Sequence, residues 1–495
     1  MNFLRLNHTL LAFCAGLLAI LGFAPYSIFP LPVFSLVLLF ILWYRTENPR
    51  IAAKLGFVFG FGLFGAGIGW IRVALHDYGD MHFLLALLAT GLFAAVLSLF
   101  PMLAGYLQAK FRGPTWMRVT LVMPAMWVLL EWLRGLMLTG FPWLSFGYSQ
   151  VPRSPLAGYA PVIGGYGLSL LVAASAGLIA LLWLKRWRGQ GKKVWAVLVM
   201  LWVVGAALRA VAWTQPAGEP LKVSLIQGNV AQDMKFRDDA MADTFSKYAR
   251  LVLQSDARLV VLPETAFPVL RSEIPDGYAA NLSDHMRRND GDILLGSFEH
   301  DRTDYYNSVF SLGTAPSQGY RKHHLVPFGE FIPARAMLSW FVNGVLDIPM
   351  GDLSSGNKSQ APLAVAGQKV AVNICYEDVF GEEIIRALPA ATLLVNVSND
   401  AWYGNSNAAV QHNQISQMRA LETGRVMLRA TNSGVTSVIN PDGYIQLALP
   451  QHEEGVLTTM VQGYAGSTPY VRWGNALVLA LLALMLALAW RWRHR

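Results

Sequence analysis

Eight stretches of this chain are apolar enough and long enough to cross a lipid bilayer as helices. A helix of about 20 residues spans the hydrocarbon layer, which is about 30 Å thick. The expected spans are 8–25, 28–44, 53–74, 83–109, 118–138, 161–184, 194–213 and 473–490. The composition agrees, because 54% of the 495 residues are hydrophobic and only 14% are charged. Such a composition excludes an ordinary soluble protein, so we expect a multi-pass membrane protein.

Positive charge is concentrated in five clusters, at the amino terminus, in every second loop and at the carboxyl terminus. These clusters hold 15 Lys and Arg residues against one acid, Glu47, so they carry +14, while the rest of the chain carries −6. The clusters consist of Arg5; Arg45, Arg50 and Lys54; Lys110, Arg112 and Arg118; Lys185, Arg186, Arg188, Lys192 and Lys193; and Arg491, Arg493 and Arg495. Cytoplasmic loops of membrane proteins carry such an excess, so we predict that both termini are cytoplasmic. No nucleic-acid partner is expected, because this charge flanks the membrane.

The apolar stretches divide the chain into three predicted parts. Residues 1–213 form a transmembrane bundle of seven helices, residues 214–472 form a globular domain, and residues 473–495 hold the eighth helix and a cytoplasmic tail. The globular segment follows the seventh helix and precedes the eighth, so it lies on the outer side of the membrane.

The globular segment has the pattern of a layered α/β sandwich. Apolar strands alternate with helices and then run in pairs. The expected strands are 221–230, 257–265, 291–300, 304–313, 370–378, 391–400 and a pair within 429–447; the expected helices are 242–255, 381–390 and 408–424.

Reactive side chains stand where three of these strands end. Glu264 closes the run ARLVVLPET, Cys375 closes VAVNICYED, and Asn399 closes ATLLVNVSND. The intervening segment YRKHHLVPFGE supplies Lys322 and Glu330. Open α/β sheets place their chemistry just beyond the carboxyl ends of strands, so we expect one pocket to collect these groups.

A thiol attacks a carbonyl carbon only as thiolate and therefore needs a base. Glu264 is the candidate base, while an ammonium at Lys322 would stabilise the thiolate and then the oxyanion of a tetrahedral intermediate. The amide of Tyr376 would share that oxyanion, and Glu330 and Glu377 would position the lysine or move a second proton.

Each of these residues has a plainer interpretation. A buried Cys375 often only fills space, and Glu264 can cap a helix. Lys322 with His323 and His324 can form a solvated basic patch, and two histidines also suggest a metal. Adjacent histidines in a strand point to opposite faces, however, so we expect neither a metal nor another cofactor.

Aromatic and apolar segments suggest contact with lipid. The outer loop 139–150 contains Trp143 and Tyr148, which suit either an interfacial belt or a lipid-binding wall. Residues 331–358, with Trp340 and Phe341, form either a lid that touches lipid or a segment packed on the domain core.

An acid and a base stand near the outer end of the fifth predicted helix. Glu131 and Arg134 are three residues apart, close enough to pair across one turn. Their role is open between a functional ion pair and snorkelling toward water.

The motifs resemble a known family. Glu264 in LPET, Lys322 in RKHHLVPFGE and Cys375 in NICYED are similar to the Glu-Lys-Cys pattern of the nitrilase superfamily. With the eight helices and FPWLSFGYSQ, the whole chain resembles the membrane-embedded apolipoprotein N-acyltransferase family of that superfamily. The resemblance implies an α-β-β-α sandwich on an eight-helix bundle in the bacterial inner membrane, with the catalytic domain periplasmic. Phe236 departs from the pattern, because the family typically has tryptophan there; its ring implies a lipid contact.

The resemblance also implies a reaction and its partners. Cys375 would accept an acyl chain from a phospholipid as a thioester and pass it to the α-amino group of a diacylated apolipoprotein, with Glu264 as base and Lys322 at the oxyanion. We expect a monomer and ping-pong kinetics. Two alternatives stay open: a membrane-anchored nitrilase-type amidase that releases its acyl group to water, and a transporter or receptor with a degenerate outer domain.

Overall fold

A computed structural model describes residues 2–184, 190–332 and 352–492 of the chain. The chain divides into two compact units. Unit 1 comprises Met1–Arg72, Phe83–Ala212 and Arg472–Arg495, and unit 2 comprises Val73–His82 and Trp213–Val471. Trp340, Phe341 and most of the predicted lid lie outside the described residues.

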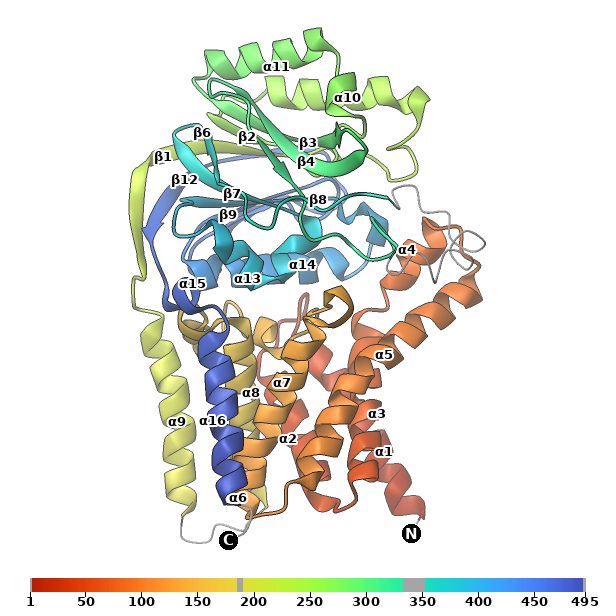
Figure 1. The fold of residues 1–495 in the computed structure, drawn as a ribbon, viewed down its shortest axis with the longest axis vertical. Helices are drawn as coiled ribbons and strands as arrows, with labels where there is room; N and C mark the ends of the chain where they lie inside the picture. Colours follow the sequence, from red (N-terminus) through yellow and green to blue (C-terminus); the bar gives the residue numbers. More distant parts are fainter. Residues whose placement is uncertain (1, 185–189, 333–351, 493–495) are drawn as a thin grey trace. The chain divides into compact units, whose positions relative to one another are not determined.

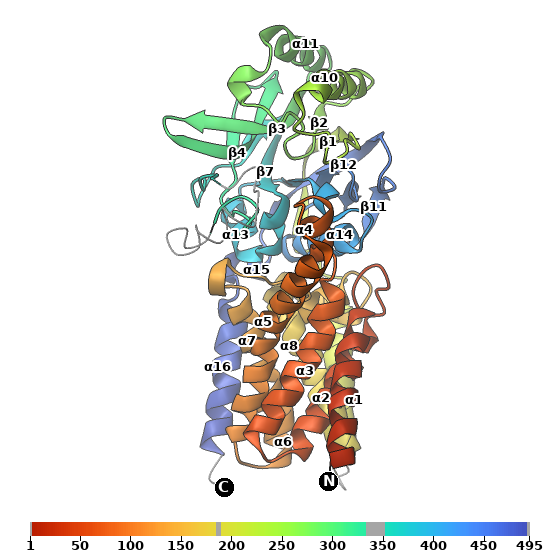
Figure 2. The same cartoon turned by 90° about the vertical axis from the view of Figure 1, so that its right-hand side faces the viewer.

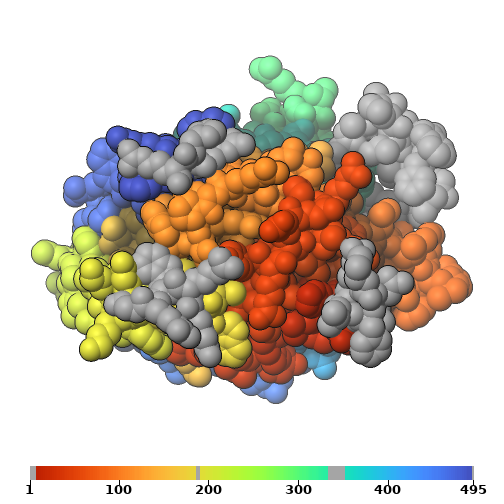
Figure 3. Space-filling model, turned by 90° about the horizontal axis from the view of Figure 1, so that it is seen from below, coloured from red at the N-terminus to blue at the C-terminus, as the bar shows by residue number. Residues whose placement is uncertain are grey.

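Unit 1 is a set of helices that run side by side (Figure 2). Helix α3 packs against α1 and α5, and α8 packs against α2 and α7. In Figure 2 the start of α1 and the end of α16 lie at the same end of the unit, and Figure 3 shows that end in space-filling form. The helices are α1 (Asn2–Ile20), α2 (Pro30–Arg45), α3 (Pro49–Gly67), α5 (Phe83–Lys110), α6 (Thr115–Met117), the π-helical turn Arg118–Val122, α7 (Met123–Arg134), α8 (Ala160–Trp183), α9 (Gly191–Leu208) and α16 (Ala476–Arg491).

Several of these helices have the length and composition of membrane spans. Within the described residues, five qualify: Pro49–Gly67, Phe83–Lys110, Thr115–Arg134, Pro155–Trp183 and Gly191–Leu208. Three shorter apolar helices, Asn7–Ile20, Pro30–Arg45 and Ala476–Arg491, overlap the first, second and eighth predicted spans.

Four predicted spans end earlier than the sequence suggested, the first at Ile20, the seventh at Leu208, and the third and fifth at sharp turns. The third ends at Gly67, and the short helix α4 (Ile71–Asp77) follows it. The fifth ends at Arg134, because a tight turn follows in which Leu138 has a φ of 55°. Apolar residues alone do not mark a helix end, since they continue through both of these turns.

Apolar side chains form exposed stripes on unit 1. On α5, Leu84, Leu88 and Leu92 are 65%, 67% and 64% exposed, and they stand four residues apart on one face. A soluble protein rarely leaves such a stripe in water, so this face of α5 is suited to lipid.

Unit 2 is built on two six-stranded sheets (Figure 1). The first has the order β12-β1-β2-β3-β4-β5 and the second β11-β10-β9-β8-β7-β6. The strands of the first sheet are β1 (Thr214–Gln227), β2 (Leu259–Val261), β3 (Asp292–Asp301), β4 (Asp304–Gly313), β5 (Gly319–Arg321) and β12 (Gly455–Gly466). Those of the second are β6 (Leu363–Val365), β7 (Gln368–Ile374), β8 (Leu393–Ser398), β9 (Met427–Thr431), β10 (Ser437–Ile439) and β11 (Ile445–Ala448).

The alternation of side chains along each strand creates separate cores. In β1, Val223 and Leu225 join the core between the sheets, whereas Ile226 joins the core beneath the outer helices. In β8, Val395 faces the other sheet and Leu394 the helix side. Strands buried on both faces therefore appear as continuous apolar runs in the sequence.

Helices cover the outer faces of both sheets. Helices α10 (Asp238–Leu253) and α11 (Asp276–Arg288) pack on the first sheet, and α13 (Gly381–Ile384) and α14 (Ala408–Thr423) lie on the side of the second (Figure 1). The order is helices, sheet, sheet, helices. The predicted α/β sandwich is thus observed, although the sequence analysis did not predict β5, β6, β12 and α11.

The topology brings strand ends to one edge. Strands β7, β8 and β9 are parallel neighbours, so Cys375 after β7 and Asn399 after β8 emerge on the same side of the second sheet. Strands β1, β2 and β3 are parallel in the first sheet, and Glu264 follows β2.

Candidate active site

Lys322 lies at the centre of a buried charged cluster that follows β5. Its side chain is 1% exposed, and its Nζ lies 2.8 Å from Oε1 of Glu330 and 3.4 Å from Oε1 of Glu264. Burial alone would disfavour the charged amine, but the carboxylates of Glu330 and Glu264 outweigh it and raise the pKa of Lys322 well above its usual value. Lys322 is therefore an ammonium at neutral pH.

Glu264 is held by neutral donors as well as by Lys322. The side-chain amide of Asn307, on β4, donates to Oε1 of Glu264 at 2.7 Å and to Oε1 of Glu330 at 3.0 Å. The backbone N–H of Asn399 donates to Oε2 of Glu264 at 2.9 Å. Both oxygens of the carboxylate are thus fixed, one of them toward Lys322.

The main chain around Glu264 needs a glycine beside it. Thr265 has a φ of 44°, which places the turn after β2 in the left-handed region. A Cβ on Gly296 of β3 would lie 2.5 Å from the carbonyl oxygen of Pro263 and 2.6 Å from the nitrogen of Thr265. Only glycine lets β3 approach this turn so closely.

Cys375 occupies a sharp turn directly after β7. Its φ is 53°, and the 3₁₀ turn Cys375–Val379 begins at this residue. Its carbonyl oxygen accepts hydrogen bonds from Nδ2 of Asn396 at 3.1 Å and Nε2 of His412 at 3.2 Å. A left-handed conformation is costly for a residue with a side chain, so these bonds help to hold the turn.

The thiol of Cys375 lies within the electrostatic reach of both Glu264 and Lys322. Burial and the Glu264 carboxylate raise the pKa of the Cys375 thiol, and the Lys322 ammonium opposes them in part. The thiol is therefore protonated at neutral pH, and a nucleophilic role requires a base.

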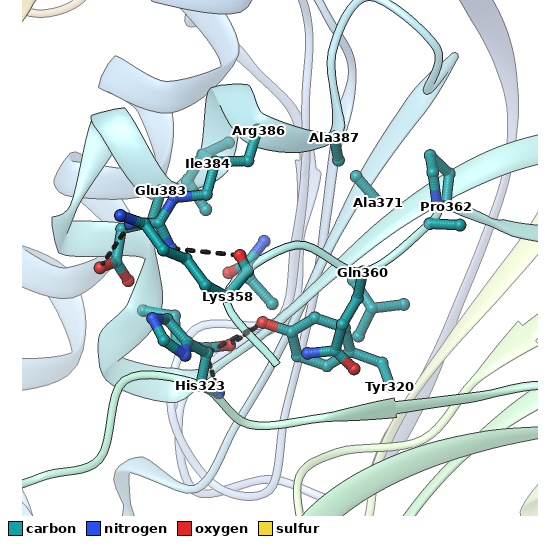
Figure 4. A pocket seen from close by; sticks show the side chains of 14 residues that line it. Tyr320, His323, Lys358, Gln360, Pro362, Ala371, Glu383, Ile384, Arg386 and Ala387 are labelled. Carbon is teal, nitrogen blue, oxygen red and sulfur yellow. Dashed lines mark hydrogen bonds and ion pairs between the residues drawn. The ribbon is translucent and has the colours of Figure 1, made fainter. Parts of the chain in front are cut away.

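Glu377 links the cysteine turn to the lysine segment. Its carboxylate accepts backbone N–H donors from Ile374 at 2.6 Å, His323 at 2.7 Å and His324 at 3.1 Å, and the hydroxyl of Tyr320 at 2.9 Å. Burial raises the pKa of Glu377, and these backbone donors counteract it. Glu377, Tyr320 and His323 line one pocket, in which Figure 4 labels Tyr320 and His323.

Tyr376 and Asn399 complete the predicted supporting set. Tyr376 is 9% exposed, and its ring lies edge-on to Phe380 with centroids 5.3 Å apart. The side-chain amide of Asn399 donates to Oε1 of Gln232 at 2.8 Å and accepts from Asn432 at 3.1 Å. Asn399 thus connects the Glu264 carboxylate with segments after β1 and β9.

Two family models match the chain. The apolipoprotein N-acyltransferase N-terminal domain matches residues 15–178, and carbon-nitrogen hydrolase matches residues 222–470. The apolipoprotein N-acyltransferase of Nitrosomonas europaea is 52% identical over 96% of this chain and 95% of the relative. The chain belongs to the apolipoprotein N-acyltransferase family. The apolipoprotein N-acyltransferases of Methylococcus capsulatus and Ralstonia nicotianae are 42% and 44% identical to this chain. Each match covers 98% of this chain, and they cover 96% and 93% of the two relatives.

The structure describes three of the aromatic residues that the sequence analysis expected at lipid: Trp143, Tyr148 and Phe236. Trp143 and Tyr148 are only 3% and 5% exposed, so they are interior residues of unit 1. Trp143 packs against Trp70, with ring centroids 5.2 Å apart. The ring of Trp143 also stacks on that of Phe141, with centroids 6.2 Å apart. Phe236 is half-buried in unit 2.

Glu131 and Arg134 hold the loop that follows them. Arg134 donates to the carbonyl oxygens of Phe141 and, at 2.7 Å, of Trp143. Glu131 accepts from the backbone N–H of Phe146 at 3.1 Å. Both side chains are buried, at 5% and 3% exposed, which contradicts the snorkelling alternative.

Cys14 and Cys375 are both free cysteines. Cys14 is exposed on α1.

Three polar residues of the site escaped the sequence analysis. They are Lys235, Asn307 and His412. Asn307 lies within a strand at a position flanked by Tyr306 and Ser308, and His412 lies inside a helix, so neither stands at the end of an apolar run. The site residues that they contact, Glu264 and Cys375, are more than 20 residues away in the sequence, and no local pattern marks them.

Proposed function

We propose that this protein transfers a fatty acyl chain from a phospholipid to the free α-amino group of the amino-terminal diacylglyceryl-cysteine of apolipoproteins. Membership of the apolipoprotein N-acyltransferase family supports the reaction class. The observation that carries the catalytic assignment is the buried Glu264–Lys322–Glu330 cluster acting on the thiol of Cys375.

In the first half-reaction, Glu264 removes the thiol proton as the sulfur attacks the ester carbonyl carbon. The Lys322 ammonium and the amide of Tyr376 stabilise the negative oxygen of the tetrahedral intermediate. The carbon–oxygen ester bond then breaks, and Glu264 returns the proton to the leaving oxygen. The products are a Cys375 thioester and a lysophospholipid.

In the second half-reaction, the α-amino group of the apolipoprotein attacks the thioester carbon. An α-amine has a pKa of about 7.7 to 8.0, so much of it is protonated at neutral pH and needs a base. Glu264 accepts this proton, the carbon–sulfur bond breaks, and Cys375 leaves as the thiol after it regains a proton. Using one site twice predicts ping-pong kinetics.

The membrane arrangement belongs to the same proposal. Eight helices span the bacterial inner membrane, both termini are cytoplasmic, and residues 214–472 lie in the periplasm with the site. The positive clusters between the apolar stretches support this orientation. The protein acts as a monomer, and Phe236, Trp143, Tyr148, Trp340 and Phe341 contribute to lipid contact directly or by supporting the surfaces that make it.

Intact-mass measurement after incubation with phospholipid tests the mechanism. We expect the wild type to gain the mass of one fatty acyl group and the Cys375→Ser variant to gain none as a thioester. Adding a diacylated lipopeptide should remove the adduct and yield acylated amine. Release of the chain only as free fatty acid would instead establish an amidase or esterase, and absence of any adduct at Cys375 would overturn the thioester route.

A further inference from the structure

A second lysine is buried beside the same carboxylate. Lys235 lies in the turn after β1, is 2% exposed, and donates from Nζ to the carbonyl oxygen of Glu264 at 3.1 Å. Lysine is almost never fully buried without a partner. Within the described residues no carboxylate forms an ion pair with Lys235. Its buried amine donates instead to a main-chain carbonyl oxygen.

The surroundings of the two buried lysines differ. Lys322 contacts two carboxylates, whereas Lys235 faces one carbonyl oxygen and lies within the electrostatic reach of Glu264 and Cys375. Burial lowers the pKa of Lys235 to about 8, although the charges of Glu264 and Cys375 favour its charged form. Lys235 is thus mostly charged at pH 7 and loses its charge in mildly alkaline solution.

A count of charges shows what Lys235 adds. Glu264 and Glu330 carry two negative charges, and Lys322 compensates only one of them. A charged Lys235 makes the cluster neutral while Cys375 is a thiol. With a neutral Lys235, the cluster would hold an uncompensated negative charge next to the atom that must itself become negative.

We propose that Lys235 is a positioning residue of the site, which fixes the main chain of Glu264 and supplies the second positive charge that favours the thiolate of Cys375. The inference rests on the proposed function for its catalytic consequence. Its effect on the sulfur, however, can be measured without any lipid substrate.

The first measurement is the rate at which iodoacetamide alkylates Cys375, from pH 6 to 9.5, in a Cys14→Ala background. We expect Lys235→Met to slow alkylation 10- to 100-fold at pH 7, because the thiolate loses a nearby positive charge. Lys235→Arg, which keeps the charge, should stay within about fivefold of the parent. As pH rises through about 8, the difference between the parent and Lys235→Met should shrink, since the parent's lysine loses its proton.

Lys247→Met is the matched control. Lys247 also donates to a main-chain carbonyl, that of Gly228 at 3.2 Å, but it lies on α10 and is paired with Glu454 at 3.7 Å. We expect its alkylation profile to equal the parent's. Thermal unfolding of every variant separates loss of structure from loss of charge, and Lys235→Arg supplies the second variant if Lys235→Met does not fold.

The second measurement is acylation of Cys375 by phospholipid, which should fall in parallel with alkylation in Lys235→Met. Unchanged alkylation in a folded Lys235→Met protein would overturn the inference, as would a loss of the same size at every pH or an equal loss in Lys235→Arg. If the wild type forms no acyl adduct yet the alkylation pattern holds, the proposed function fails and the role of Lys235 stands.

Discussion

At the scale of single residues, burial and neighbouring charges together determine whether each side chain of the site is protonated. Lys322 is buried with two carboxylates and keeps its charge, whereas Cys375 is half-buried near a carboxylate and keeps its proton. The resting site is therefore a thiol beside an ion pair. In the proposed mechanism, proton transfer from Cys375 to Glu264 accompanies attack, because the thiolate is not the stable resting form.

Glu264→Gln tests both the role of Glu264 as base and its effect on the Cys375 thiol. The variant keeps the shape of the side chain but loses the base, so we expect acylation of Cys375 by phospholipid to fall by about 10² to 10⁴-fold. The negative charge that raises the pKa of the thiol is lost as well, so alkylation of Cys375 by iodoacetamide at pH 7 should become faster. Intact-mass kinetics measure both rates.

A variant that merely disturbed the fold would also lose acylation, and exposure of Cys375 would speed its alkylation because burial no longer raises the pKa of the thiol. Thermal unfolding of Glu264→Gln must therefore match that of the wild type, and a variant in which Glu264 had no role as base would leave acylation intact. Glu273→Gln is a suitable control, because Glu273 lies in the exposed 3₁₀ turn Arg271–Glu273, where it accepts from the N–H of Leu270.

At the scale of elements, the cysteine turn depends on a buried polar network under the end of β7. Nε2 of His412, on α14, lies 2.8 Å from Asp378, and Nδ1 lies 3.0 Å from Asp400. Arg429 on β9 contacts Asp400 at 2.9 Å. Two acids and two bases thus tie helix α14 to strands β8 and β9 beneath the carbonyl of Cys375.

His412 should make the stability of unit 2 depend on pH. Burial and Arg429 oppose its charge, but Asp378 and Asp400 outweigh them and raise its pKa to about 9, above the ordinary value of 6.5. A raised pKa contributes stability that is fully present below pH 6.5 and is lost as pH rises through about 9. The size of this contribution is about 3 kcal/mol.

Comparison with His412→Gln isolates the effect. Urea unfolding in detergent should show the variant to be less stable than the wild type by more at pH 6 than at pH 9.5. A difference in the free energy of unfolding that stays constant with pH would show that His412 is neutral in the folded protein. His300→Gln, at an exposed position on β3, should match the wild type throughout.

At the scale of the whole molecule, the two units have surfaces of different kinds. Unit 1 exposes leucines such as Leu84, Leu88 and Leu92, which water would not favour. Unit 2 exposes ion pairs instead, for example Lys222 with Asp256 at 2.6 Å. The contrast fits one unit in lipid and one in water. In the proposed orientation, the loops with the positive clusters are the cytoplasmic ones.

Single cysteines test the proposed orientation. In a protein without Cys14 and Cys375, we expect Gln254→Cys, exposed at the end of α10, to react with a membrane-impermeant maleimide in intact cells. Lys192→Cys, exposed at the start of α9, should react only after the inner membrane is opened. The reverse pattern would place the catalytic unit in the cytoplasm and contradict the proposal.

The sequence alone determined the features that arise from local patterns. Apolar runs of helical length predicted the helices of unit 1, and short apolar runs that end in polar residues predicted the strands that carry Glu264, Cys375 and Asn399. Both inferences work because burial selects apolar residues along one element at a time. Parallel pairing then brings strand ends to one edge, whatever the loops between them contain.

Only the tertiary structure decided which distant residues surround those ends. Lys235 and Asn307 reach Glu264 from turns and strands 29 and 43 residues away, and His412 reaches Cys375 from a helix 37 residues away. The same holds for Trp143, because a large amphipathic ring suits either an interface or a packed interior. The protonation state of a side chain likewise depends on all the charged groups around it in space, and these groups come from several stretches of the sequence.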